Sequence, residues 1–296
     1  MNSVVATLIS NPARPGLSDA LAHSASAAFG ASAPDWLAEG IACDIALPDG
    51  ADLGEADAAI RAALGGAPID VVVQPRAARR KRLLIADMDS TMIDQECIDE
   101  LADVVGVKPH VAAITARSMN GEIAFEPALR ERVALLKGLP VTVVAEVIAG
   151  RITLAAGGVA LVRTMKARGA WTALVSGGFT SFTGPVAAMI GFDENIANTL
   201  GEEGGKLTGL VAEPILGRAA KAQALAAISA RLGIAPGDAI AVGDGANDLD
   251  MLALAGSGVA LHAKPAVAAA ARLRIDHGDL TALLYMQGYR RHEFVE

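Results

Sequence analysis

The chain has 296 residues, of which 52% are hydrophobic and 3% aromatic, and its formal net charge is −8 at pH 7. This charge argues against nucleic acid and anionic membranes as partners, because both attract basic surfaces, and few aromatic side chains are available for base stacking. The two cysteines form no Cys-x-x-Cys motif, the histidines lack zinc spacing, and no uncharged apolar run is long enough to span a bilayer. We therefore expect a cytoplasmic protein with neither disulfides nor a membrane span.

Residues 1–75 are expected to form a separate small domain. Its strand-like and helix-like runs alternate, at 4–9, 17–29, 41–47, 55–64 and 69–73. Ser18 and Asp52 stand where helix N-caps are expected. This order predicts an α+β sandwich that loosely resembles the ACT-type domains that sense amino acids. No specific ligand motif occurs, so binding of an amino-acid effector and a structural role, including formation of a homodimer, are both left open.

A basic linker follows at residues 76–82, in which five of the seven residues are Lys or Arg. Such a run can bind nucleic acid or act as a targeting signal, but a solvated junction between domains is the favoured interpretation. The linker separates the N-terminal domain from residues 83–296, which we expect to form the main domain.

The most informative motif follows the apolar run at residues 83–86, which is typical of a short buried strand. The motif spans residues 87–92, with the sequence DMDSTM, and places acids at Asp87 and Asp89. In open α/β sheets, ligands bind at the carboxyl ends of the strands. Two neighbouring acids there indicate a cation site, or a nucleophile beside a proton carrier. A solvated turn rich in Asp is the alternative interpretation of this motif alone.

Two later strand-like runs also end in polar residues and glycines. These residues are Asp244 and Asp248 after the run at 239–242, and Ser176 and Gly177 after the run at 171–175. Glycine lets the backbone turn sharply and approach a ligand closely. The backbone N–H groups of a Ser-Gly-Gly turn at a helix start can bind a phosphate. The three strand ends together therefore predict one phosphate site with several carboxylates.

The segments between these motifs predict how the domain is built. Residues 93–150 have helical patterns separated by glycines, which indicates a helical insertion over the site. From residue 155 onward, helical and strand patterns alternate, which predicts a parallel sheet with helices on both faces. The glycine-rich stretch at 195–211 breaks this alternation and suggests a β-hairpin.

In this order, the three motifs resemble those of the haloacid dehalogenase superfamily of phosphotransferases. The resemblance covers about residues 83–290. The segments GEIAF at 121–125 and LRERV at 129–133 resemble most those members of the superfamily that act on O-phosphoserine. The resemblance implies an α/β catalytic domain at 83–296, with a doubly wound parallel sheet and a helical cap at about 93–150. It also implies hydrolysis of O-phospho-L-serine to L-serine and phosphate through an aspartyl-phosphate, the last step of serine biosynthesis.

The resemblance assigns the chemical roles to individual residues. Asp87 would be the nucleophile, Asp89 the general acid and base, and Lys221 the cation that neutralises the phosphoryl oxygens. Mg²⁺ would be bound by Asp87, the backbone carbonyl of Asp89 and Asp244, with Asp248 behind them. Helix N-capping is an alternative for the last two acids, and for Asp248 it is compatible with the functional role.

The resemblance also implies how the substrate is recognised. Glu96 would bind the ammonium group and Arg132 the carboxylate, with Arg130 as a rival two residues earlier. The remaining residues expected to contact the phosphate or to pack around the substrate are Ser176, Gly177, Asn247, Met119 and Phe125. A sugar phosphate would leave the acid and the arginine unpaired, so a sugar-phosphate mutase is disfavoured.

Other functions remain open at this point. One alternative is the same chemistry on another small phosphate, and another is transfer of the phosphoryl group to a second acceptor such as homoserine. A purely regulatory amino-acid-binding protein is a different class. The presence of Asp87, Asp89, Lys221 and Asp244 argues against a role without catalysis.

Overall fold

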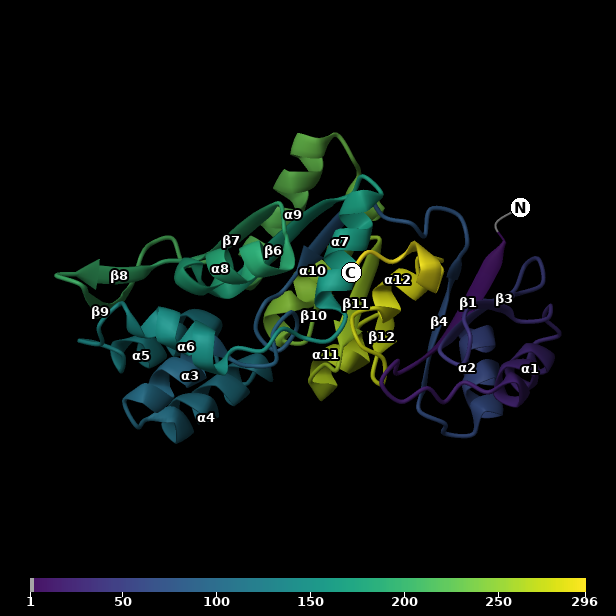
Figure 1. Cartoon of the computed structure of the whole chain (residues 1–296), viewed down its shortest axis with the longest axis horizontal. Helices are drawn as coiled ribbons and strands as arrows, with labels where there is room; N and C mark the ends of the chain where they lie inside the picture. Colours follow the sequence, from purple (N-terminus) through teal and green to yellow (C-terminus); the bar gives the residue numbers. More distant parts are fainter. Residues whose placement is uncertain (1–2) are drawn as a thin grey trace. The chain divides into compact units, whose positions relative to one another are not determined.

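The computed structural model describes residues 3–296, and the chain divides into two compact units. The smaller unit comprises the residues up to Arg82 together with 156–169 and 273–296, and the larger unit comprises 83–155 and 170–272. Figure 1 shows the helices and strands of both units. Within residues 3–296, no helix combines the length and the apolar character that crossing a bilayer requires.

The centre of the smaller unit is a four-stranded antiparallel sheet with the strand order β2-β3-β1-β4. Its first six elements are β1 (Val4–Ser10), α1 (Asp19–Ala28), β2 (Asp35–Ala38), β3 (Ala42–Ala46), α2 (Leu53–Leu64) and β4 (Ile69–Pro75). Ser18 accepts a hydrogen bond from the Leu21 N–H, and Asp52 accepts two from the next helical turn, so both predicted caps are confirmed. Strand β2 was not predicted, because four residues are too few to show an alternating pattern.

The core of the smaller unit lies between this sheet and its two helices. Leu8, Ile45, Ile60 and Val71 are buried there in one cluster. The unit also contains α7 (Gly158–Ala167), β12 (Leu273–Ile275) and α12 (Ala282–Tyr285). The carboxylate of Asp70 on β4 accepts backbone hydrogen bonds from residues 276–278, which fixes the C-terminal segment to this sheet. The predicted small α+β unit is therefore confirmed as a fold.

The larger unit contains consecutive strands of a parallel sheet in the order β11-β10-β5-β6-β7. These strands are β5 (Leu83–Ala86), β6 (Trp171–Phe179), β7 (Glu194–Asn198), β10 (Ala239–Gly243) and β11 (Ser257–Leu261), and the helices beside them are α8 (Thr180–Ile190), α9 (Arg218–Leu232), α10 (Leu249–Leu254) and α11 (Pro265–Ala270). Leu83 and Ile85 of β5 are buried against Leu225 of α9 and Met251 of α10. Because helices cover the strands of this parallel sheet, their residues are buried, and the strands are therefore apolar runs in the sequence.

A helical insertion follows β5, as the sequence predicts. It consists of α3 (Cys97–Val104), α4 (Lys108–Met119), α5 (Phe125–Ala134) and α6 (Val143–Arg151). A hairpin of β8 (Leu200–Glu203) and β9 (Lys206–Val211) lies beside α5, where Gly138 and Leu139 exchange backbone hydrogen bonds with Leu207. The expected hairpin thus begins later than residue 195, because residues 194–198 form β7 of the parallel sheet.

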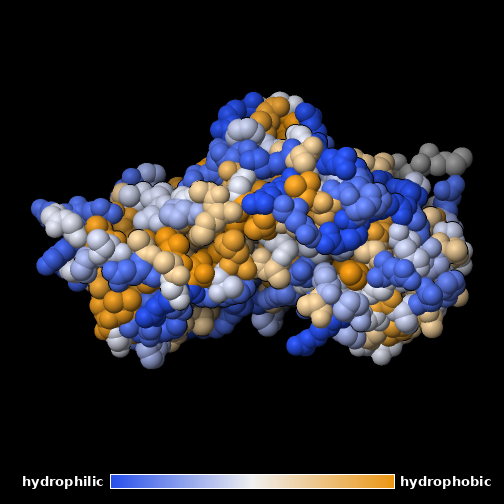
Figure 2. All heavy atoms as spheres, viewed as in Figure 1, coloured by the Kyte–Doolittle hydropathy of each residue, from blue (hydrophilic) through white to orange (hydrophobic). Residues whose placement is uncertain are grey.

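The surface of the chain mixes residue types. Figure 2 shows hydrophobic residues interspersed with hydrophilic ones over the face in view. The described hydrophobic residues that are exposed include Met189 on α8 and Leu210 on β9. The polar residues that the sequence places after the strands, Asp87 and Asp244 among them, are instead buried.

Candidate functional site

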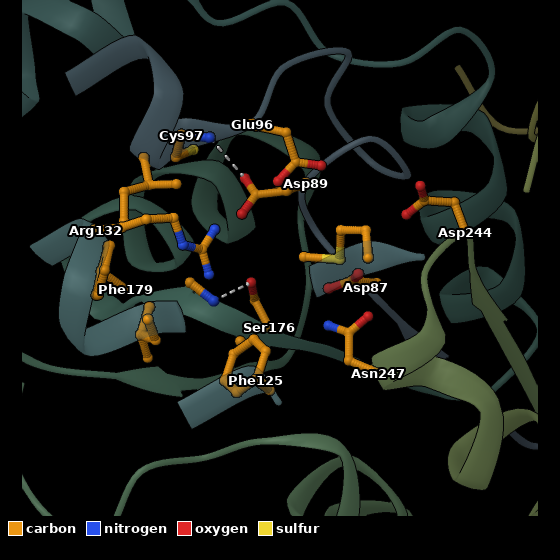
Figure 3. A pocket seen from close by; sticks show the side chains of 15 residues that line it. Asp87, Asp89, Glu96, Cys97, Phe125, Arg132, Ser176, Phe179, Asp244 and Asn247 are labelled. Atoms are coloured by element: carbon orange, nitrogen blue, oxygen red, sulfur yellow. Dashed lines mark hydrogen bonds between the residues drawn. The ribbon is translucent and has the colours of Figure 1, made fainter. Parts of the chain in front are cut away.

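The parallel sheet brings three of the predicted strand ends to one edge. Asp87 follows β5, Ser176 lies near the end of β6, and Asp244 follows β10. Ala86 of β5 pairs with Leu174 of β6 on one side and Val242 of β10 on the other, so the three polar residues are neighbours. A pocket opens here, and every predicted site residue lines it except Lys221 and Asp248. Figure 3 shows Asp87, Asp89 and Ser176 in the middle, with Arg132 on one side and Asp244 on the other.

Three carboxylates are concentrated at this site, two lining the pocket and the third, that of Asp248, outside its lining. Asp87, Asp244 and Asp248 are buried, and each offers an oxygen within 4.8 Å of the others. Asp248 also accepts a hydrogen bond of 3.0 Å from the Gly245 N–H. A Cβ atom on Gly243 would lie 2.3 Å from the Asp248 carboxyl carbon, so only glycine fits at the end of β10. Carboxylate oxygens are the hard ligands that a divalent cation such as Mg²⁺ prefers, so this cluster fits such a cation.

The buried ammonium of Lys221 pairs with two of these acids. Its Nζ lies 2.7 Å from Asp87 Oδ1 and 2.7 Å from Asp248 Oδ1, and 2% of the lysine side chain is exposed. Burial and the charge of Asp248 raise the pKa of Asp87, while Lys221 opposes this shift. Burial alone would lower the pKa of Lys221, but the charges of Asp248 and Asp87 outweigh it and raise that pKa. The lysine therefore remains a fixed positive charge beside Asp87.

The second acid of the motif contacts the start of the helical insertion. Asp89 Oδ1 accepts a hydrogen bond of 3.3 Å from the Cys97 N–H at the beginning of α3. Burial raises the pKa of Asp89, and the hydrogen bonds from Cys97 oppose this. A raised pKa is suited to a carboxyl group that must hold and release a proton. The sequence indicated Cys97 as a buried thiol but gave no sign that it lines the pocket.

Glu96 is held by the serine of the same motif. Ser90 Oγ donates a hydrogen bond of 2.7 Å to Glu96 Oε1. Ser90 itself has a φ of 53°, in the left-handed region that few residues other than glycine adopt. Removal from water, followed by the charges of Asp89 and Asp244, raises the pKa of Glu96 well above its ordinary value. A cationic group in the pocket would relieve this repulsion.

Arg132 enters the pocket from α5 and is fixed by neighbours in the insertion. Its side chain is buried, with Nη1 donating to Thr115 Oγ1 at 2.9 Å and Nε donating to the Ala128 carbonyl at 3.1 Å. Thr115 in turn donates to Asp99 Oδ1 at 2.8 Å. The rival Arg130 instead pairs with Glu213 at the surface. The structure thus places Arg132 in the pocket and Arg130 outside it, while Thr115 and Asp99 escaped notice because nothing in the sequence marks them.

The Ser-Gly-Gly segment, predicted as a turn after residue 175, lies within β6 at an irregularity of its pairing with β7, and it meets the insertion across the pocket. Ser176 Oγ accepts a hydrogen bond of 2.8 Å from the Gly178 N–H. A Cβ atom on Gly177 would lie 2.7 Å from the ring of Phe125, and one on Gly245 would lie 2.9 Å from the sulfur of Met119. Both predicted packing residues therefore contact the glycines of the sheet edge.

Two further polar side chains lie at this end of the sheet, one without a hydrogen-bond partner among the described residues and one paired with an acid. Asn247 Oδ1 is buried and has no hydrogen-bond partner among residues 3–296, as expected of a group that binds a ligand or water. Lys264 Nζ lies 3.1 Å from Asp244 Oδ2. The sequence did not identify Lys264 as a site residue, although it follows β11, the strand next to β10. The sequence could have indicated Lys264 as a site residue, because it follows another apolar strand whose carboxyl end lies at the same edge.

The sheet, the insertion and the acidic edge define the class of the protein. Residues 84–253 match the model of the haloacid dehalogenase-like hydrolase family. The match covers more than half of the chain, and the chain belongs to that family. The predicted α/β fold with its inserted helical cap is thereby confirmed.

Within the family, curated relatives that the chain resembles include phosphoserine phosphatases. The chain is 45% identical to one from Archaeoglobus fulgidus over 72% of this chain and 64% of that protein. It is 48% identical to one from Albidiferax ferrireducens over 69% of this chain and 88% of that protein. The chain thus spans less than two thirds of the length of some of these relatives, including a Streptomyces coelicolor protein at 57%.

Solved structures show the same likeness. A hydrolase of the same superfamily from Salmonella enterica serovar Typhi has a TM-score of 0.85 at 30% identity, covering 97% of this chain and 98% of that one. A phospho-aspartyl intermediate analogue of a phosphoserine phosphatase has a TM-score of 0.67 at 40% identity, covering 70% of this chain and 98% of that one. The first likeness extends over both units of the chain.

Proposed function

We propose that the protein is a Mg²⁺-dependent phosphatase that hydrolyses O-phospho-L-serine to L-serine and phosphate through an aspartyl-phosphate on Asp87. The observation that carries the proposal is the buried Lys221 ammonium 2.7 Å from both Asp87 and Asp248, because Asp87 lines a pocket that Glu96 and Arg132 also line. The names of the similar relatives support the choice of substrate.

In the proposed first step, a carboxylate oxygen of Asp87 attacks the phosphorus atom. Asp89, whose pKa burial raises, donates a proton to the departing serine oxygen. Lys221 offsets the charge that accumulates on the phosphoryl oxygens, and Ser176, the Gly177 N–H and Asn247 bind these oxygens. In the second step, Asp89 takes a proton from a water molecule, and this water releases phosphate from Asp87.

A divalent cation fits the acids that surround this step. Asp87, the Asp89 carbonyl and Asp244 would hold it, while Asp248 would fix the position of Lys221 and the Gly245 turn. The cation would supply the charge that lets a carboxylate approach a phosphate dianion. All other parts of the proposed reaction are carried by the side chains named above and by the Gly177 N–H.

Selectivity would come from the pair of opposite charges above the phosphate. Glu96 would accept hydrogen bonds from the substrate ammonium, and the fork of Arg132 would bind the carboxylate. Met119 and Phe125 would close the pocket, since both contact glycines at the sheet edge. A phosphate ester without these two charges would leave buried ionic groups unpaired, which disfavours its binding.

Several parts of the interpretation stay predictions. These are the place in serine biosynthesis, the cytoplasmic location, a homodimer, and an amino-acid effector at residues 1–75. Transfer of the phosphoryl group to an acceptor such as homoserine is the alternative use of the same intermediate. Adding acceptor alcohols to the reaction distinguishes the two, because transfer yields a new phosphate ester in place of free phosphate.

The proposal is tested by Mg²⁺-dependent phosphate release from a panel of O-phosphoserine, O-phosphothreonine, sugar phosphates and nucleotides. We expect strong selectivity for O-phosphoserine, lost in chelator and in Asp87→Asn. Selectivity for sugar phosphates would refute the roles of Glu96 and Arg132 but leave the chemistry at Asp87. Undiminished release by Asp87→Asn would refute the nucleophile.

A further inference from the structure

Lys264 brings a second ammonium group to the acidic cluster. Its Nζ lies 3.1 Å from Asp244 Oδ2, and its backbone N–H donates to the Asp244 carbonyl at 3.1 Å. It stands directly before α11, at the carboxyl end of β11, while Asp244 stands at the carboxyl end of the neighbouring β10. The pairing of these two strands therefore fixes the backbone of Lys264 beside that of Asp244.

The two lysines of the cluster differ in their freedom to move. Lys221 has 2% of its side chain exposed and lies between two buried acids, so withdrawing it would leave both unpaired. Lys264 has 36% of its side chain exposed while its partner Asp244 has 4%. A lysine ammonium is a compact, strongly hydrated charge on a flexible stem, so a half-exposed one can move into water at little cost.

Asp244 is also one of the three acids whose oxygens lie within 4.8 Å of one another. A divalent cation held there and the Lys264 ammonium would require the same carboxylate and would repel each other. The other oxygen of Asp244 lies 3.5 Å from Thr91 Oγ1, a long contact that leaves the carboxylate weakly held on that side. Lys264 is thus placed to neutralise Asp244 when the divalent cation is absent.

We propose that Lys264 is an exchangeable counter-ion that a divalent cation displaces from Asp244, and that it thereby sets the affinity of the site for Mg²⁺. This inference rests on the metal site of the proposed function and adds a residue that the reaction itself does not require. Removing the ammonium should strengthen Mg²⁺ binding, because the cation then meets neither a competitor nor a repelling charge.

The test is calorimetric titration of Mg²⁺ into the full chain after treatment with chelator, without substrate. Lys264→Met should lower the Kd for Mg²⁺ roughly tenfold, as expected for removal of one positive charge that lies in water about 5 Å from a divalent ion. Lys264→Arg, which keeps the charge, should stay within about threefold of the unsubstituted chain. Lys108→Met is the matched control, because Lys108 also pairs with an acid, Glu100, and has 38% of its side chain exposed.

The melting temperature provides a second readout. Without Mg²⁺, Lys264→Met should melt below the unsubstituted chain, because Asp244 then lacks its ammonium, and saturating Mg²⁺ should remove the difference. If the methionine variant does not fold without metal, Lys264→Gln repeats the titration with a polar side chain of similar length. Equal or weaker Mg²⁺ binding by the folded variant would overturn the role of Lys264 alone. Absence of Mg²⁺ binding by the unsubstituted chain would overturn this role and the metal site together.

Discussion

The ammonium nitrogen of Lys221 lies 2.7 Å from the carboxylate of Asp87, and 2% and 6% of the two side chains are exposed. The same nitrogen is equally close to Asp248, which in turn binds the Gly245 N–H. The positive charge is therefore positioned before any substrate arrives. Charge that is fixed in advance needs no reorganisation during the reaction, which is the main source of electrostatic catalysis.

Replacing Lys221 with Met should destabilise the metal-free protein. Two buried carboxylates would lose their shared cation, and breaking a buried ion pair costs about 3–5 kcal/mol of the free energy of unfolding. Urea denaturation in chelator measures this loss. Lys108→Met, which removes a partly exposed ion pair, should change the stability by less than about 1 kcal/mol. Equal losses in the two variants would show that the buried ion pair contributes no more to the free energy of unfolding than the partly exposed one.

Replacing Glu96 with Gln should reduce selectivity for the substrate ammonium. The amide keeps the size of the side chain and can still accept the Ser90 hydrogen bond, but it lacks the negative charge. We expect kcat/KM for O-phosphoserine to fall roughly 10- to 100-fold, the range for a lost hydrogen bond to a charged group. The phosphate ester of 3-hydroxypropionate, which lacks the ammonium group, should be hydrolysed at an unchanged or higher rate. A parallel loss on both substrates would contradict the assignment.

Replacing Thr115 with Val should disturb Arg132 without touching the reacting atoms. The variant removes the hydroxyl that links Arg132 Nη1 to Asp99. KM for O-phosphoserine should rise roughly 3- to 10-fold with little change in kcat, because the loss of one buried hydrogen bond affects binding of the carboxylate. Thr115→Ser should behave as the unsubstituted chain. An equal effect on phosphoethanolamine, which has no carboxylate, would argue for a general packing defect.

Mg²⁺ should stabilise the folded protein even without substrate. A ligand that binds the folded state alone, at about 100 times its Kd, adds about 2.7 kcal/mol to the free energy of unfolding. Thermal unfolding with and without Mg²⁺ measures this gain, and chelator should reverse it. Asp244→Asn should abolish most of the gain, since it removes one of the three clustered carboxylates. An undiminished shift in this variant would place the cation elsewhere.

The polar residues at the strand ends were predictable from the sequence because each follows a short apolar run. Asp87, Ser176 and Asp244 lie side by side because β5, β6 and β10 are parallel neighbours whose carboxyl ends meet at one edge of the sheet, as the sequence predicted. Lys221 was different, because the sequence shows a lysine in a helix and cannot show that α9 buries it. Its selection depended on the family resemblance, and the contact with Asp87 needed the structure.

The residues that the sequence missed act through neighbours that are distant along the chain. Thr115 contacts Arg132, and Asp99 contacts Thr115, only because α3, α4 and α5 pack together. Lys264 contacts Asp244 because β11 pairs with β10. Periodicity describes single elements and carries no information on such contacts. The domain boundaries drawn at residues 75 and 82 stay predictions.

The central claim is that Asp87 carries the phosphoryl group during the reaction. The most direct measurement is acid quenching of the enzyme within its first turnovers of O-phosphoserine and Mg²⁺, followed by mass spectrometry of its peptides. The account predicts one phosphoryl group on Asp87, absent when chelator is added and absent in Asp87→Asn. Release of phosphate with no modified Asp87, or with the group on another residue, would contradict the account.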